Sequence, residues 1–230
     1  MVTTLYLLRH GETEGSGTKR YHGSIDVPLS ERGALQMLSR STFIYEHLRS
    51  SRARHQTNYL RDIHKENALS TEDSGGETLS AVYCSDLRRS EKSAEIVAGR
   101  FALRPVIISD LRERGFGIWE GMSFLEIQET HPEEFALWAS NPLKYSPPGG
   151  ENTVQVKERV IRALDMLIGR HDGQKLAIVA HGGVNRIILC HILGVSLENI
   201  FRLEQDHAAV NVIEFWEKYP VVKLMNGGSQ

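Results

Sequence analysis

An arginine and a histidine, Arg9 and His10, stand side by side near the start of the chain, directly after the apolar residues 5–8. An imidazole can attack phosphorus as a nucleophile, and a guanidinium can hold two phosphate oxygens through parallel hydrogen bonds. The pair therefore predicts a site that binds a phosphoryl group and accepts it covalently.

Other reactive side chains follow further apolar segments in the same way. Residues 4–8, 81–84, 105–108 and 176–180 are short and apolar and end in polar or glycine-containing turns, so we interpret them as buried strands. Ser85 and Arg89 follow the second, Glu113 follows the third, and His181 follows the fourth. Because the carboxyl ends of parallel strands meet at one edge of a sheet, we expect these residues to lie together with Arg9 and His10.

The segments between the strands predict helices. Ser30 is a suitable N-cap for a helix over residues 31–48, Asp86 is one for a helix over 87–101, and residues 153–170 carry apolar positions close to the period of one helical face. Two C-terminal strands, 208–215 and 221–225, surround a turn at Tyr219 and Pro220. The alternation of strands and helices predicts an α/β fold, a three-layer α/β/α sandwich with a mostly parallel central sheet.

Length and composition are those of a globular protein. The 230 residues include 40% hydrophobic and 24% charged residues with a formal net charge of −2, which argues against nucleic acid as a partner. Cys84 and Cys190 lack metal-ligand spacing, so we interpret them as reduced core thiols. No segment is long and apolar enough for a membrane span or a secretion signal, so we expect a cytoplasmic protein with no membrane partner. We expect a single domain over residues 1–230, with a polar insertion at about 49–78.

Seven short motifs occur in an order that resembles the histidine phosphatase superfamily, in its phosphoglycerate mutase-like branch. They lie at residues 8–13, 26–30, 85–89, 111–113, 117–121, 148–151 and 179–182. The resemblance makes His10 the nucleophile that becomes phosphohistidine, with Arg9, Arg89 and His181 around the phosphoryl group. It makes Glu113 the proton donor to the leaving oxygen, without a metal ion or another cofactor.

Both histidine and carboxylate must be in suitable protonation states for these roles. The cations around His10 should lower its pKa by like-charge repulsion, which keeps a lone pair available for attack. Glu113 must carry a proton when it donates, and its neighbours Arg112 and Arg114 leave open the alternative that it forms only a surface ion pair.

The loop after the nucleophile supplies further candidates for substrate contacts. These candidates are Ser16, at a position where many relatives place asparagine, together with Tyr21, His22, Gly23 and, after the fourth strand, Gly182. Arg20 could contact substrate or only support the loop. We interpret Phe116 and Trp119 as packing residues.

The resemblance also bears on the reaction. Glu113 and His181 are 68 positions apart, whereas the mutases of the family carry a longer insertion there, so we favour a phosphatase acting on a small phosphorylated metabolite. The motifs at 11–14, 26–30, 117–121 and 148–151 are most similar to those of α-ribazole-5′-phosphate phosphatases of cobalamin biosynthesis. A phosphoglycerate mutase, a broad-specificity sugar or phosphoserine phosphatase, and a noncatalytic phosphate-binding protein stay open as alternatives, as does a homodimer.

Overall fold

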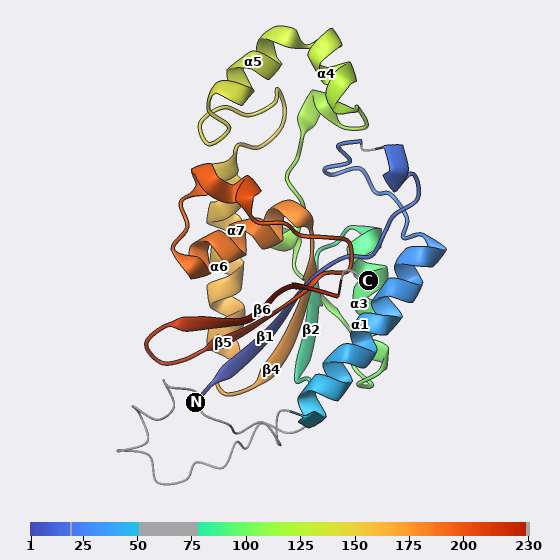
Figure 1. Cartoon of the computed structure of the whole chain (residues 1–230), viewed down its shortest axis with the longest axis vertical. Coiled ribbons are helices and arrows are strands. Elements are labelled where there is room, and N and C mark those ends of the chain that lie inside the picture. The colour runs from blue at the N-terminus through green and yellow to red at the C-terminus, as the bar shows by residue number, and fades with distance from the viewer. Residues whose placement is uncertain (19, 51–77, 229–230) are drawn as a thin grey trace.

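A mixed sheet runs through the part of the chain that the structure describes, with its strands in the order β3-β2-β4-β1-β5-β6 (Figure 1). The structure is a computed structural model, and it describes residues 1–18, 20–50 and 78–228. The strands are β1 (Thr3–Arg9), β2 (Ala81–Cys84), β3 (Val106–Ile107), β4 (Lys175–Ala180), β5 (Val210–Phe215) and β6 (Pro220–Gly227). The first four are parallel, while β5 and β6 are antiparallel to their neighbours, which confirms a mostly parallel sheet.

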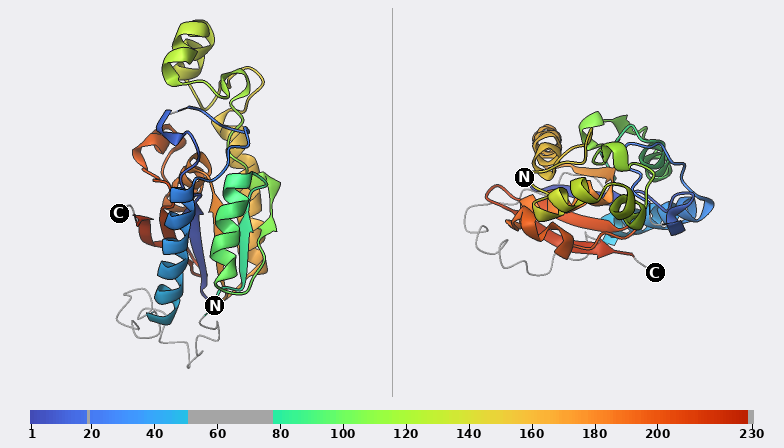
Figure 2. Two further views of the ribbon diagram at one scale, coloured as in Figure 1. Left: turned by 90° about the vertical axis from the view of Figure 1, so that its right-hand side faces the viewer. Right: turned by 90° about the horizontal axis from the view of Figure 1, so that it is seen from above.

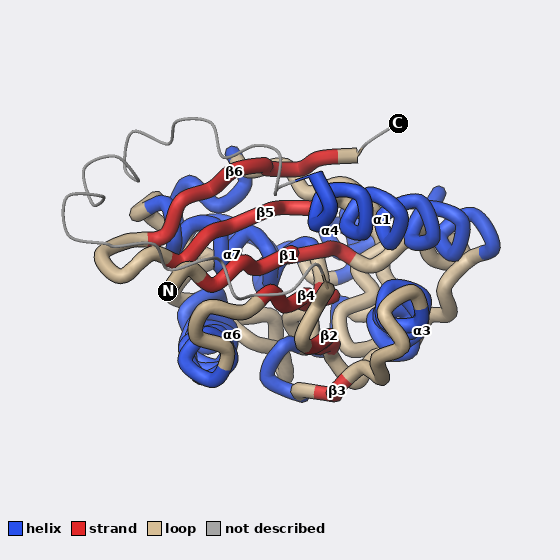
Figure 3. Tube along the Cα trace, turned by 90° about the horizontal axis from the view of Figure 1, so that it is seen from below, coloured by secondary structure: helices blue, strands red, loops and turns tan. Residues whose placement is uncertain are grey.

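Helices cover both faces of the sheet. Successive side chains of a strand point to opposite faces, so a strand that is apolar throughout needs cover on both sides. In β1, Leu5 and Leu7 pack with the apolar side of α6 (Thr153–Arg170) and α7 (Gly182–Leu193), whereas Tyr6 and Leu8 pack with α1 (Glu31–Ser50) and α3 (Arg88–Gly99). Figures 2 and 3 show the sheet between these two layers of helices. The predicted α/β/α sandwich is therefore confirmed.

A pair of short helices, α4 (Phe124–Thr130) and α5 (Pro132–Ser140), projects beyond the carboxyl ends of the parallel strands (Figure 1). Ser123 and Glu126 form a capping box at the start of α4, and Pro132 occupies the first turn of α5, where its missing N–H costs nothing. Trp119, which is 2% exposed, packs against Phe135 and Trp138 beneath the pair. This confirms Trp119 as a packing residue.

Short 3₁₀ helices complete the connections. They are η1 (Ser16–Thr18), η3 (Ser109–Leu111), η4 (Gly117–Trp119) and η5 (Leu197–Arg202). The predicted helix at residues 153–170 is confirmed to the residue, and Asn152 caps it. The predicted helix at 31–48 extends two residues further, and the Ser30 hydroxyl accepts from the Gly33 amide as an N-cap does. The helices α4, α5 and α7 were not among the predicted segments.

Three predictions about local structure were wrong. The strand predicted at 105–108 is reduced to Val106 and Ile107, each 49% exposed, because β3 lies at the sheet edge and pairs only with β2. Asp86 does not cap α3, since its carboxylate accepts from Arg112 instead. The strand predicted from residue 208 begins at Val210, because Ala208 has a φ of 56° and cannot extend the strand.

Both cysteines are buried and free, as predicted. The polar insertion predicted at 49–78 falls almost entirely on residues 51–77, outside the described residues, while Arg49 and Ser50 complete α1. Over the described ranges, no helix combines the length and the apolar character that a membrane crossing requires.

Candidate active site

The ends of β1, β2 and β4 bring the predicted chemical residues together. Arg9 is the last residue of β1, Ser85 follows β2, and His181 lies between β4 and α7. The His10 amide donates to the Ala180 carbonyl at 3.0 Å, which extends the pairing of β1 with β4 past the strand. As a result the rings of His10 and His181 meet edge to face, with centroids 5.1 Å apart.

His10 is arranged as a neutral imidazole. Its Nδ1 lies 2.7 Å from the carbonyl oxygen of Gly11, and since a carbonyl can only accept, Nδ1 carries the ring proton. Burial holds the pKa of His10 well below its usual range, and the neighbouring His181, Arg9 and Arg89 lower it further. The lowered pKa of His10 agrees in direction with the prediction from the surrounding cations, and it favours a ring whose Nε2 keeps its lone pair at neutral pH.

His181 is fully buried beside it. Its Nε2 lies 2.7 Å from the Ser85 hydroxyl, and its Nδ1 is buried with no hydrogen-bond partner among the described residues. If the hydroxyl donates to Nε2, the ring proton stays on Nδ1, where it can donate to an oxyanion. Burial, together with Arg89 and Arg9, holds the pKa of His181 well below its usual range.

Two guanidinium groups complete the positive end of the site. Arg9 donates to the carbonyl of Gln205 at 2.7 Å and to Nε2 of His207 at 3.0 Å, while Arg89 donates to the carbonyls of Ile25 and Gly23, both at 2.7 Å. Burial lowers the pKa of both arginines from the ordinary value. Within the described residues, neither forms an ion pair, so the buried Arg89 and the partly buried Arg9 make this end of the site suited to an anion.

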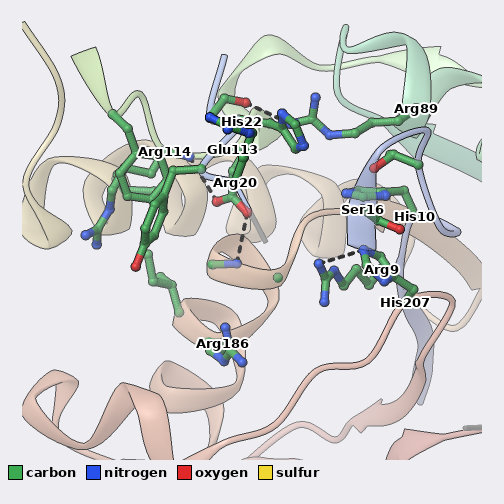
Figure 4. A pocket seen from close by; sticks show the side chains of 18 of the residues that line it. Arg9, His10, Ser16, Arg20, His22, Arg89, Glu113, Arg114, Arg186 and His207 are labelled. Atoms are coloured by element: carbon green, nitrogen blue, oxygen red, sulfur yellow. Dashed lines mark hydrogen bonds between the residues drawn. The ribbon is translucent and has the colours of Figure 1, made fainter. Parts of the chain in front are cut away.

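Glu113 is held by two backbone amides, one from the next residue, Arg114, and one from Gly183 at the start of α7. Its Oε1 accepts from the Arg114 amide at 2.9 Å, and its Oε2 accepts from the Gly183 amide at 3.1 Å (Figure 4). Arg112 pairs with Asp86 instead, so the alternative of a surface ion pair at Glu113 is wrong for the described residues. A carboxyl group so placed faces the same cavity as His10.

These side chains surround a cavity of about 410 Å³. All the loop residues predicted to contact substrate line it, namely Ser16, Tyr21, His22, Gly23 and Gly182, as does Arg20. Phe116 also lines it, and its ring packs against Tyr21 with centroids 4.9 Å apart, as expected of a packing residue. Arg20 has a supporting role too, because it donates to both carboxylate oxygens of Glu126 in α4 and to the carbonyl of Gly121.

The cavity contains residues that the sequence did not single out. His207 lies against Arg9 and His10, and Arg114, Trp138, Arg186 and Phe201 form the rest of the wall with apolar neighbours. No motif marks His207, which follows a polar loop and not a predicted strand. Within the described residues, no cluster of histidine, cysteine or acidic side chains is suited to hold a metal ion.

The architecture and the site are those of an enzyme that handles phosphoryl groups. The chain belongs to the histidine phosphatase superfamily (branch 1), whose family model matches residues 5–48 and 65–227. It is similar to phosphoserine phosphatase 1 of Hydrogenobacter thermophilus, with 29% identity over 98% of this chain and 92% of that protein. It is also similar to the adenosylcobalamin/alpha-ribazole phosphatase of Escherichia coli, with 23% identity over 96% of this chain and 95% of that protein.

A solved structure agrees with this membership. Bacillus stearothermophilus YhfR matches with a TM-score of 0.77 and 27% identity, covering 99% of this chain and 98% of that one. The protein is thus a phosphatase of the histidine phosphatase superfamily.

Proposed function

We propose that the protein hydrolyses a small phosphomonoester through a phosphohistidine at His10, without a metal ion. The observation that carries this proposal is the contact of His10 Nδ1 with the Gly11 carbonyl, which leaves Nε2 facing two arginines that have no acidic partner among the described residues. Burial and the neighbouring cations hold the pKa of His10 below its usual range, which favours the neutral ring. A phosphate dianion is the counter-ion that such a site favours. The same charges stabilise a transferring phosphoryl group, a task that other phosphatases give to metal ions.

In the first half-reaction, Nε2 of His10 forms a bond to phosphorus while the bond from phosphorus to the ester oxygen breaks. Glu113, in its protonated form, gives its proton to the departing oxygen, and the alcohol leaves. Arg9, Arg89 and His181 hold the phosphoryl oxygens through the transfer. Glu113 is then a carboxylate.

In the second half-reaction, a water molecule attacks phosphorus and the bond to His10 breaks. The carboxylate of Glu113 takes the proton from that water, which restores the acid, and inorganic phosphate leaves. The backbone amides of Arg114 and Gly183 keep the carboxyl group in one place for both steps.

The sequence motifs favour α-ribazole 5′-phosphate as the substrate, and a relative named for that activity supports this candidate. A relative named phosphoserine phosphatase is more similar in sequence, so phosphoserine is the second candidate. The short segment between Glu113 and His181 argues against a mutase, as the resemblance implied.

The test is to trap an acid-labile phosphoenzyme from a panel of α-ribazole 5′-phosphate, phosphoserine, 3-phosphoglycerate and p-nitrophenyl phosphate, in excess chelator. We expect labelling and turnover that His10→Ala abolishes. Undiminished turnover in His10→Ala, or complete loss in chelator, would contradict the proposal. Transfer between the hydroxyls of phosphoglycerate would show a mutase, and binding without turnover of any ester would show a noncatalytic protein.

A further inference from the structure

Arg159 of α6 forms an ion pair with Glu151 behind the active site. Its Nε and Nη2 donate to the two carboxylate oxygens of Glu151, each at 2.8 Å. Both residues line a second cavity, of about 450 Å³, and neither lines the cavity that holds His10. Among the described residues, only Glu113 lines both cavities. An effect of the ion pair on the reaction therefore passes through the segment that carries Glu113.

This segment has no regular structure of its own. Residues 112–116 lie between η3 and η4, outside the helices and strands of the described chain. A loop of this kind lacks the hydrogen-bond ladder of a sheet and is more mobile than the elements that it connects. A proton donor nevertheless has to stay within hydrogen-bond reach of the leaving oxygen. Contacts from other parts of the chain are needed to hold it there.

Arg159 supplies such contacts to the backbone that leads to Glu113. Its Nη1 donates to the carbonyls of Asp110 at 2.8 Å and Arg112 at 2.6 Å, and its Nη2 donates to the carbonyl of Glu113 at 3.3 Å. That last carbonyl belongs to the same peptide group as the Arg114 amide, which donates to Oε1 of Glu113. Because a peptide group is planar and rigid, a hydrogen bond to its carbonyl also fixes the direction of its N–H. One peptide group thus connects the Arg159 guanidinium to the catalytic carboxyl group.

Glu151 holds the backbone that follows Glu113. Its Oε2 accepts from the Gly115 amide at 3.0 Å, and its own amide donates to the Gly115 carbonyl at 2.9 Å. Although burial raises the pKa of Glu151, the hydrogen bonds from Arg159 and from the Gly115 amide bring it below the ordinary value. Glu151 is therefore a carboxylate at neutral pH, and the charged pair binds the loop on both sides of Glu113.

A second arginine of α6 offers a comparison. Arg162 donates to the Asp110 carboxylate at 3.1 Å, and its side chain is 69% exposed, whereas that of Arg159 is 16% exposed. The five N–H groups of the Arg159 guanidinium match its five contacts, three of them with backbone carbonyls. A lysine carries its three donors on one nitrogen and cannot copy this arrangement. The number and burial of these contacts distinguish Arg159 from an ordinary surface ion pair.

We propose, resting on the phosphatase function above, that Arg159 and Glu151 form a positioning pair for the proton donor. By fixing the peptide group that follows Glu113, the pair keeps the carboxyl group directed at the leaving oxygen. The pair touches neither the phosphoryl group nor the leaving group. It therefore affects the rate at which the ester bond of a poor leaving group breaks, and it leaves phosphate binding by the residues around His10 unchanged.

Arg159→Gln tests the pair through the leaving group. For the best alkyl phosphate of the panel above, we expect the single-turnover rate of phosphoryl transfer to fall by about 10- to 100-fold, because a displaced donor loses part of its contribution. For p-nitrophenyl phosphate, whose phenolate leaves without a proton, the same rate should stay within about 3-fold of wild type. Inhibition by inorganic phosphate should also stay within about 3-fold.

Further variants separate positioning from folding. Arg159→Lys keeps the charge opposite Glu151 but not the contacts with the carbonyls, so its rate with the alkyl phosphate should fall between those of Arg159→Gln and wild type. Combining Arg159→Gln with Glu151→Gln should cost no more than the larger single loss, since residues that act as a unit are not additive. Arg162→Gln should keep wild-type rates with both esters. Thermal melting reports the fold of each variant, and Arg159→Lys provides the test if Arg159→Gln does not fold.

Two results would overturn the positioning role and leave the phosphatase function intact. One is a folded Arg159→Gln protein that transfers phosphate from the alkyl ester at the wild-type rate. The other is an equal loss with both esters, which a general disturbance of the site would produce. By contrast, a wild-type protein that forms no phosphoenzyme from any ester of the panel contradicts the proposed function itself.

Discussion

His10 donates a hydrogen bond of 2.7 Å from Nδ1 to the carbonyl oxygen of Gly11, and this contact decides which ring nitrogen can react. With the proton on Nδ1, only Nε2 has a lone pair to offer. We expect the trapped phosphoenzyme to carry its phosphate on Nε2, which NMR of ¹⁵N-histidine-labelled protein can assign. Phosphate on Nδ1 would show that the imidazole ring of His10 flips before it reacts.

Glu113→Gln should affect substrates according to their leaving groups. For an alkyl phosphate the departing oxygen needs a proton, so we expect kcat to fall by about 10²- to 10⁴-fold, the range for a general acid. For p-nitrophenyl phosphate, whose phenolate leaves without help, the first step should fall far less. Steady-state and burst kinetics on both esters provide the measurement, and equal losses would argue against a proton donor.

Gly183→Ala should reduce activity by displacing Glu113. An added Cβ would lie 2.6 Å from Oε1 of Glu113, and because a side chain can move more easily than backbone, the carboxyl group must shift. We expect kcat toward alkyl phosphates to fall by about 10- to 100-fold, part of the contribution of a positioned acid, with little change in melting temperature.

The matched control is Gly169→Ala, on an exposed part of α6 where an added Cβ meets nothing within 4 Å. It should keep full activity and stabilise the fold by about 0.5–1 kcal/mol, since glycine disfavours a helix. Normal activity in Gly183→Ala would show that the Glu113 carboxyl group has room to move without loss.

His207 should matter as an acceptor for Arg9. Its Nε2 accepts from Nη2 of Arg9 at 3.0 Å, so His207→Ala removes one of the two contacts that fix the guanidinium. We expect kcat/KM to fall by about 10-fold and inhibition by inorganic phosphate to weaken, whereas His207→Gln, which keeps an acceptor oxygen, should stay within about 3-fold of wild type. Equal losses in both variants would rule out this role.

Stability should fall as the pH is lowered from about 6.5. The pKa of His207 is lowered to about 4, chiefly by burial and next by Arg9, and those of His10 and His181 are also well below the ordinary 6.5. In this range the unfolded chain binds more protons than the folded one, so the free energy of unfolding decreases as pH falls. Below about 4.5, protonation of paired carboxylates such as Glu126, whose pKa is lowered to about 2, adds to the loss.

Urea unfolding between pH 7.5 and 4.5 measures this slope. His207→Gln should flatten the slope between pH 6.5 and 4.5 by up to one proton, because that variant has no imidazole to charge in the unfolded state. An unchanged slope would show that the burial of His207 does not affect its titration.

The phosphate end of the site could be predicted because it follows a simple rule of parallel sheets. Arg9, His10 and His181 come directly after apolar runs of strand length, and such ends converge. Glu113 was also predicted from a preceding strand, although that strand, β3, has only two residues and both are exposed. Its position depends on backbone amides that no side-chain pattern reveals.

The rest of the cavity wall could not be predicted by the same rule. Arg114 lies in the sequence between Glu113 and Gly115, where an arginine is expected at the surface. It is buried because α6 packs beside it. His207 follows η5 and a polar loop, held by side-chain amides such as Gln205 and Asn211 that bond to each other. The contacts of Arg114 with Thr153 and of His207 with Arg9 join residues that are 39 and 198 positions apart, so no periodicity along the chain marks them.

The projecting helices α4 and α5 form a part of the molecule that is separate from the sheet and its covering helices. The segment that holds them leaves the body near Gly121 and returns near Pro142, and the Arg20–Glu126 pair joins it to the loop after His10. Insertions or replacements within it therefore leave the sheet untouched. Of the residues in α4 and α5, Trp138 lines the cavity, so a change in this segment would alter that part of the wall and leave Arg9 and His10 in place at the end of β1.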